Sequence, residues 1–157
     1  MDFTVFLTVM SGVLTYVVGQ LLLKLFIEPV QATRKTIGDI SHSLIEYANV
    51  ISNPGVPSEE VMRNTASHLR KLSAQLQSHL YLVPKYEATA RLFALPSRDK
   101  VLSASISLIG LSNGVYRATE KVYEQNASDV ENICDSLSIY LPDDERISKA
   151  VPVTRSE

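Results

Sequence analysis

The sequence contains a single cysteine, Cys134, and no excess of basic residues. A lone cysteine excludes an intrachain disulfide and fits a reducing compartment. Lys and Arg number 15 against 17 Asp and Glu, which leaves a formal net charge of −2. Proteins that bind nucleic acid normally carry a concentrated basic face. We therefore expect no nucleic-acid partner.

Motifs that hold cofactors or metals are also missing from the sequence. The chain has no Walker loop, no dinucleotide-binding glycine motif and no C-x-x-C pair. Its three histidines, His42, His68 and His79, are not spaced at i, i+4, as zinc-binding pairs on a helix are. We expect no catalytic residue, no cofactor, no metal and no small-molecule substrate, and we predict that the protein is not an enzyme.

The most distinctive segment is an apolar run at residues 3–23, which carries no charge. As a helix it would reach roughly 32 Å, close to the hydrocarbon thickness of a bilayer, about 30 Å. Its flanks, Asp2 and Lys24, do not suit a cleaved signal peptide, which begins with basic residues and ends in a small-residue cleavage site. The alternative is a buried core helix, but such helices rarely run this long without a charge. We predict an uncleaved transmembrane helix.

Basic residues near the ends of this helix predict its orientation. Lys24, Arg34 and Lys35 follow it, and no Lys or Arg precedes it. The positive-inside rule then places the N-terminus outside and the rest of the chain in the cytoplasm. We expect a single-pass protein of the inner or plasma membrane, with the lipid bilayer as its first partner.

Small residues line part of the predicted transmembrane helix. Ser11, Thr15 and Gly19 are spaced by four, and Gly12 belongs to a second row with two threonines. Small residues at this spacing let helices pack closely in lipid. They predict contact with a second copy or with another membrane protein, although Gly and Thr are also simply common in membrane helices.

The rest of the sequence predicts helices and no strands. Helices separated by Pro and Gly signals are expected over about residues 30–52, 58–83, 85–95, 97–124 and 128–141. Pro29 can kink or restart the chain before the first of them, and Ser58 and Ser128 are the expected N-caps of two others. Apolar residues repeat at heptad spacing along the longer segments, as in a bundle or coiled coil.

The predicted fold class is therefore all-α, with one N-terminal transmembrane helix and a soluble bundle of about four helices. We divide the chain into an anchor (1–28), a bundle domain (29–142) and a polar, flexible tail (143–157). At 45% hydrophobic and 20% charged residues, the chain is too apolar to be disordered throughout.

Residues 101–116 allow two other interpretations. Gly110-Leu-Ser112-Asn-Gly114 matches the G-x-S-x-G nucleophile motif, but every histidine precedes Ser112 and the chain is too short for the α/β-hydrolase fold. We favour a small-residue helix that packs closely on its neighbours. The same uncharged segment could enter a membrane, although 16 helical residues reach only about 24 Å.

His42 is a candidate phosphoacceptor. Ser41-His42-Ser43-Leu44 resembles the phosphoacceptor helix of sensor histidine kinases, and the heptad pattern places His42 on the outer face. The sequence departs from the family pattern because Ser43 replaces an acidic residue and the following Pro is absent. The alternative is an exposed histidine one turn from Glu46.

Two shorter segments carry weaker signals. Residues 85–100 mix Lys and Arg with Tyr, Leu and Phe, so they could lie on an anionic membrane surface. We favour a connector that closes the bundle. Asn126-Ala127-Ser128 matches a glycosylation sequon. Helix capping explains Ser128, and a cytoplasmic location would exclude the modification.

The leading functional prediction is a non-enzymatic membrane protein whose bundle binds another protein or a second copy, as a scaffold, accessory subunit or regulator. The alternatives are a phosphotransfer-type signalling component that uses His42 and a membrane-active effector that inserts residues 101–116.

Overall fold

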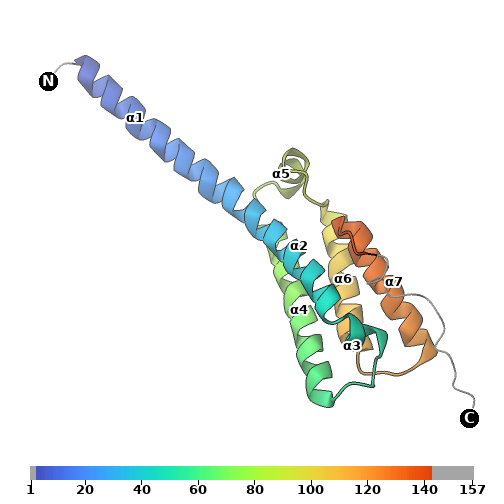
Figure 1. Cartoon of the computed structure of the whole chain (residues 1–157). Coiled ribbons are helices and arrows are strands. Elements are labelled where there is room, and N and C mark those ends of the chain that lie inside the picture. Colours follow the sequence, from blue (N-terminus) through green and yellow to red (C-terminus); the bar gives the residue numbers. More distant parts are fainter. Residues whose placement is uncertain (1–2, 143–157) are drawn as a thin grey trace, which may run out of the picture.

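A computed structural model of the protein describes residues 3–142, and the tail predicted at 143–157 lies outside this range. Every regular element among the described residues is a helix, which confirms the all-α prediction. The first is α1 (Phe3–Leu22), which extends away from a helical bundle (Figure 1). It is the apolar helix predicted from the sequence.

The helix does not end at Pro29. A π-helical turn (Leu23–Ile27) follows α1 and leads directly into α2 (Glu28–Glu46). The N–H of Glu28 bonds to the carbonyl of Leu23, five residues back. A proline lacks an N–H, and its ring crowds the carbonyl four residues earlier in a regular helix. The wider turn stands just before Pro29, so one long helix joins the exposed α1 to the bundle.

The helix predicted over 30–52 is interrupted once. α2 ends at Glu46, the next residue Tyr47 has φ of −99° and ψ of 11°, and the five-residue α3 (Ala48–Ser52) follows. The predicted apolar stripe faces inward across this break: Val30, Ile40, Leu44 and Ile51 are buried.

The second predicted bundle helix is confirmed as α4 (Glu59–Leu82). Ser58 is its N-cap and accepts a hydrogen bond from the Val61 N–H at 3.4 Å. The helix runs antiparallel to α2, since His68 pairs with Ser43 and the later His79 pairs with the earlier Thr36.

The short helix expected over residues 85–95 is α5 (Tyr86–Leu92). Helix α4 ends at Leu82, Val83 is extended, and Lys85, just after Pro84, takes a left-handed conformation with φ of 45°. Tyr86 is buried, and its hydroxyl donates to the carbonyl of Pro96 at 2.9 Å. Figure 1 shows α5 at the end of the bundle nearest α1.

The boundaries predicted for the last two helices were wrong. α6 (Arg98–Gly114) begins after its N-cap Ser97, as expected, but it ends about ten residues before residue 124. The carbonyl of Val115 accepts the N–H of Gly55 at 2.8 Å, so it is taken by another loop instead of by the next helical turn. α7 (Glu120–Leu137) then begins well before the predicted start at Ser128.

Ser128 is therefore not an N-cap. It lies exposed in the middle of α7, whose N-cap is Thr119. The neighbouring Asn126 of the sequon is buried.

The bundle is formed by α2, α4, α6 and α7, with α6 packed against both α4 and α7. Its core is a continuous cluster of mostly aliphatic side chains from these four helices, together with Ile51 of α3 and Tyr86 and Ala90 of α5. The largest fully buried members are Ile40, Ile51, Leu69, Leu76, Leu108, Leu111 and Ile133. Burying each such side chain stabilises the fold by about 1.5–3 kcal/mol before losses of entropy.

Candidate functional site

The first candidate surface is α1, which has no buried residue. Ser11, Gly12, Thr15 and Gly19, the predicted packing residues, are all exposed on it. A Cβ atom added to Gly12 or Gly19 would meet nothing within 4 Å. Among the described residues, the helix that begins at Phe3 is the one long and apolar enough to span a membrane, by length and composition.

His42, the candidate phosphoacceptor, lies on the outer face of α2. Its side chain is 78% exposed, and Nε2 lies 3.7 Å from the Glu46 carboxylate, one turn further on. This position agrees both with a phosphoacceptor and with an exposed histidine that only neighbours Glu46, so the role of His42 remains a prediction.

The other two histidines join α4 to α2, with His68 partly buried and His79 buried. His68 Nε2 lies 2.9 Å from the Ser43 hydroxyl, and His79 Nε2 lies 2.9 Å from the Thr36 hydroxyl. His79 is buried, and this burial lowers its pKa because the charged imidazolium loses its hydration. The sequence does not predict either pair, since both depend on the register between two helices.

The G-x-S-x-G segment is a close-packing site within the bundle. Ser112 is fully buried, and its hydroxyl donates to the Ile109 carbonyl of its own helix at 2.7 Å. A Cβ atom on Gly110 would overlap the carboxylate of Asp129, and one on Gly114 would overlap the side-chain amide of Asn126. The glycines let α7 approach the backbone of α6, as the favoured interpretation of this segment expects.

A polar cluster also joins α6 to α7. The side chain of Asn132 donates to the hydroxyls of Ser103 and Ser107, at 3.0 and 2.8 Å. Asp129 lies beside them, and burial raises the pKa of its carboxyl. Hydrogen bonds from Ser107 and Gln125 lower this pKa, but burial is the larger effect. The serines that lower the membrane propensity of residues 101–116 thus make contacts inside the bundle.

The outward face of α6 exposes apolar side chains beside charged groups: Asp99 is exposed one heptad before Ile106, and Asn113 accepts a hydrogen bond from the Arg70 guanidinium. Ile106 is 69% exposed, and Ile109 and Asn113 are also exposed on this face. The opposite face is buried and holds Val101 and Leu108. A helix exposed in this way presents apolar side chains that suit a protein partner.

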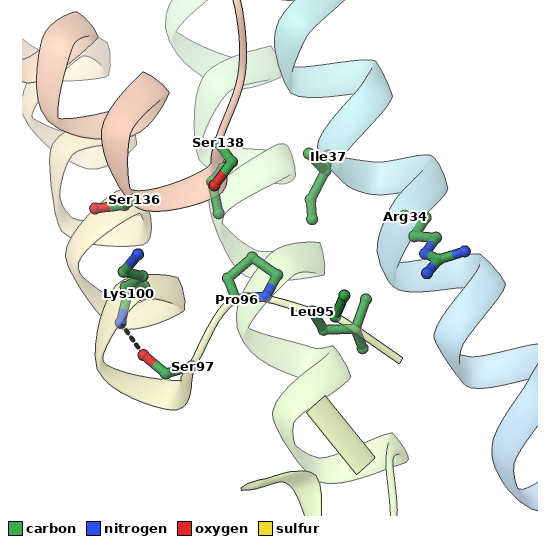
Figure 2. Close-up of a pocket in the computed structure, with 10 residues that line it drawn as sticks. Arg34, Ile37, Leu95, Pro96, Ser97, Lys100, Ser136 and Ser138 are labelled. Atoms are coloured by element: carbon green, nitrogen blue, oxygen red, sulfur yellow. Dashed lines mark hydrogen bonds between the residues drawn. The ribbon is translucent and has the colours of Figure 1, made fainter. Parts of the chain in front are cut away.

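A cavity of about 290 Å³ opens near the α5 end of the bundle. Figure 2 shows Ser97, Lys100, Ser136 and Ser138 gathered on the α6 and α7 side, with Arg34 across from them on α2. Several of these groups already bond within the fold: Arg34 donates to the Phe93 carbonyl at 2.7 Å, and Ser136 donates to Asn132 at 3.2 Å. Arg34 and Lys100 are the charged residues among those that line it.

Between residues 3 and 142, no group of three or more His, Cys, Asp or Glu side chains is placed to hold a metal ion. Cys134 of α7 is partly buried and packs against the core of the bundle.

Fold and surfaces together define a class of protein: a helical bundle with one candidate membrane-spanning helix. Comparison with known proteins found no matching family model, no matching curated protein and no matching solved structure.

Proposed function

We propose that the chain is a single-pass membrane protein without catalytic activity, whose bundle and membrane helix bind another protein or a second copy. In this role it is a scaffold, an accessory subunit or a regulator. The observation that carries the proposal is α1, an uncharged helix with no buried residue that continues through Pro29 into a bundle helix. Such an apolar surface is stable only in lipid or against another protein.

Two further observations support contact with a protein. Ser11, Thr15 and Gly19 leave room for a second helix along α1. In the bundle, Ile106 and Ile109 are exposed on the outward face of α6. The basic residues that follow α1, with Lys24 first, support a cytoplasmic bundle in the inner or plasma membrane.

Site-specific photo-crosslinking in native membranes tests the proposal. A photoreactive residue at Thr15 lies on the small-residue face of α1, and a matched one at Val17 lies about 200° around the same helix. We expect a discrete adduct from Thr15, either a dimer of the chain or one other membrane protein, and a much weaker one from Val17. A parallel probe at Ile106 examines the bundle. Equal capture from both α1 positions, or no adduct from any position, would contradict the proposal.

A further inference from the structure

The end of the bundle nearest α1 exposes several large side chains. Tyr81 and Leu82, in the last turn of α4, are 80% and 58% exposed, and Leu92, at the end of α5, is 78% exposed. Single exposed apolar residues are ordinary. These three belong to adjacent elements at one end of the bundle, the end from which α1 departs (Figure 1).

Two cations accompany these side chains. Lys85 and Arg91 are exposed before and within α5. The acidic residue of this helix, Glu87, turns toward α6, where its carboxylate accepts the Arg98 N–H at 3.2 Å. Mixed cationic and apolar side chains at one surface are typical of segments that rest on anionic lipid.

The register of α2 and α4 gives the height of this surface above a membrane. Because His79 pairs with Thr36 in antiparallel helices, Leu82, three residues later, lies level with about residue 33. The apolar run continues past Lys24 to Ile27, and a lysine at that depth can extend its ammonium to the headgroups. Leu82 is then roughly 9 Å along the helix from the hydrocarbon edge.

The interfacial layer of a bilayer is roughly 5–8 Å thick on each side. Transmembrane helices tilt by about 20° on average, and a tilt toward α4 lowers this side of the bundle by several ångströms. α5 follows α4 at the same end (Figure 1). The exposed side chains are therefore within reach of the headgroups.

We propose that Tyr81, Leu82, Lys85, Arg91 and Leu92, here called the α5 surface, rest in the headgroup layer of a bilayer that contains anionic lipid. The contact fixes the tilt of the bundle and so the direction in which α6 faces. This inference rests on the proposed function in one respect, because it needs α1 to cross the bilayer. The partner is the lipid surface itself, chosen because α1 delivers this end of the bundle to it.

Fluorescence quenching in vesicles tests the α5 surface with the full chain. With Cys134 replaced by Ser, an environment-sensitive dye is placed by Leu92→Cys, Val56→Cys or Val13→Cys in separate samples. Val56 is the matched control, since it is 72% exposed and lies in the loop between α3 and α4 at the opposite end of the bundle. The vesicles contain phosphatidylcholine with phosphatidylglycerol and a lipid that carries a quencher near its headgroup.

We expect quenching at residue 92 to exceed quenching at residue 56 at least about twofold. Replacing Lys85 by Asn and Arg91 by Gln should reduce it, because each cation near an anionic surface contributes about fivefold to its occupancy. Vesicles of phosphatidylcholine alone should give the same loss.

The dye at Val13 separates this inference from the proposed anchor. If residue 13 is protected from an aqueous quencher and residue 92 behaves like residue 56, the anchor stands and the α5 surface is wrong. If residue 13 is as accessible to that quencher as residue 56, the anchor itself is wrong. Protection of residue 92 from the aqueous quencher without lipid quenching would show a protein partner in place of lipid, and would also overturn the inference.

Discussion

Asn126 of α7 lies directly against the backbone of Gly114 in α6, at a separation that leaves no space for a Cβ atom on residue 114. The same side chain donates a hydrogen bond from Nδ2 to the carbonyl of Ile51 at 3.0 Å, which ties α7 to the end of α3. Asn126 is buried and held from both sides, so it cannot move aside without losing that bond. The side chain of Asn126 thus links three helices at the end of the bundle far from α1.

Gly114→Ala should destabilise the protein. Alanine normally favours a helix over glycine by about 0.5–1 kcal/mol. Here the added methyl group overlaps the buried amide of Asn126, and overpacking of this kind costs about 1–3 kcal/mol. The measurement is denaturant unfolding of the full chain in detergent micelles, followed by circular dichroism.

Gly38→Ala is the matched control for this substitution. Gly38 lies exposed in α2, and an added Cβ atom would meet nothing within 4 Å. We expect Gly38→Ala to raise the free energy of unfolding by roughly 0.5–1 kcal/mol. The double variant with Asn126→Ala should lose less stability than the two single changes added together. If Gly114→Ala matched Gly38→Ala, the close contact between α6 and α7 would be wrong.

His79 should make the fold less stable in mild acid. Burial lowers the folded-state pKa of His79 below its ordinary value of 6.5, so the unfolded chain binds this proton more readily than the folded chain. Stability is therefore complete above about pH 6.5 and declines as the pH falls toward the folded-state pKa. Chemical unfolding at a series of pH values measures the decline.

The variant His79→Gln keeps a hydrogen-bonding group opposite Thr36 but cannot titrate. Its stability should change less between pH 7.5 and pH 5.5 than that of the unchanged chain. Parallel curves for the unchanged chain and His79→Gln would count against a buried, neutral His79.

The sequence predicts the helices and their buried faces better than it predicts the contacts between helices. Ile40, Leu44, Leu69 and Leu76 repeat at helical spacing, and all four are buried, because a regular stripe must face the core. Ser58 also caps its helix as predicted. Local patterns of this kind do not need the fold to be known.

The break between α6 and α7 could not be predicted in this way. Val115 and Val122 continue the apolar spacing of α6 across residues 115–119, and Ala118 lies between them. The helix ends because the Val115 carbonyl bonds to Gly55, which is distant in sequence. The interior pairs of His68 and His79 depend likewise on the register between helices.

Asp129→Asn should stabilise the protein at neutral pH. Burial raises the folded-state pKa of the Asp129 carboxyl, so the folded chain binds this proton more readily than the unfolded chain. The contribution of the Asp129 carboxyl to the free energy of unfolding is therefore most favourable in acid and diminishes as the pH rises through the folded-state pKa. Asparagine retains an acceptor for Ser107 without the charge. The advantage of the variant should disappear as the pH approaches about 4, and an advantage independent of pH would point to packing instead.

His42 permits a direct test of the phosphotransfer alternative. If the protein only binds a partner, His42→Ala should leave crosslinking from Thr15 and Ile106 unchanged, because its side chain is 78% exposed and pairs with Glu46 of its own helix. Unfolding stability should change by less than about 0.5 kcal/mol. Acid-labile phosphate on the unchanged chain from cells, absent from His42→Ala, would instead favour signalling through this histidine.

Bulky residues on the small-residue face of α1 should weaken association in the membrane. Gly12→Ile and Gly19→Ile each place a branched side chain where the helix surface is now open, and close approach of two helices then becomes sterically impossible. Val17→Ile adds one methyl group on the opposite side of the helix and is the control. We expect energy transfer between labelled chains in vesicles, or crosslinking to a different membrane protein, to fall strongly for both glycine variants and little for Val17→Ile. Equal behaviour of the three variants would leave α1 as a tether alone and move the partner-binding surface to α6.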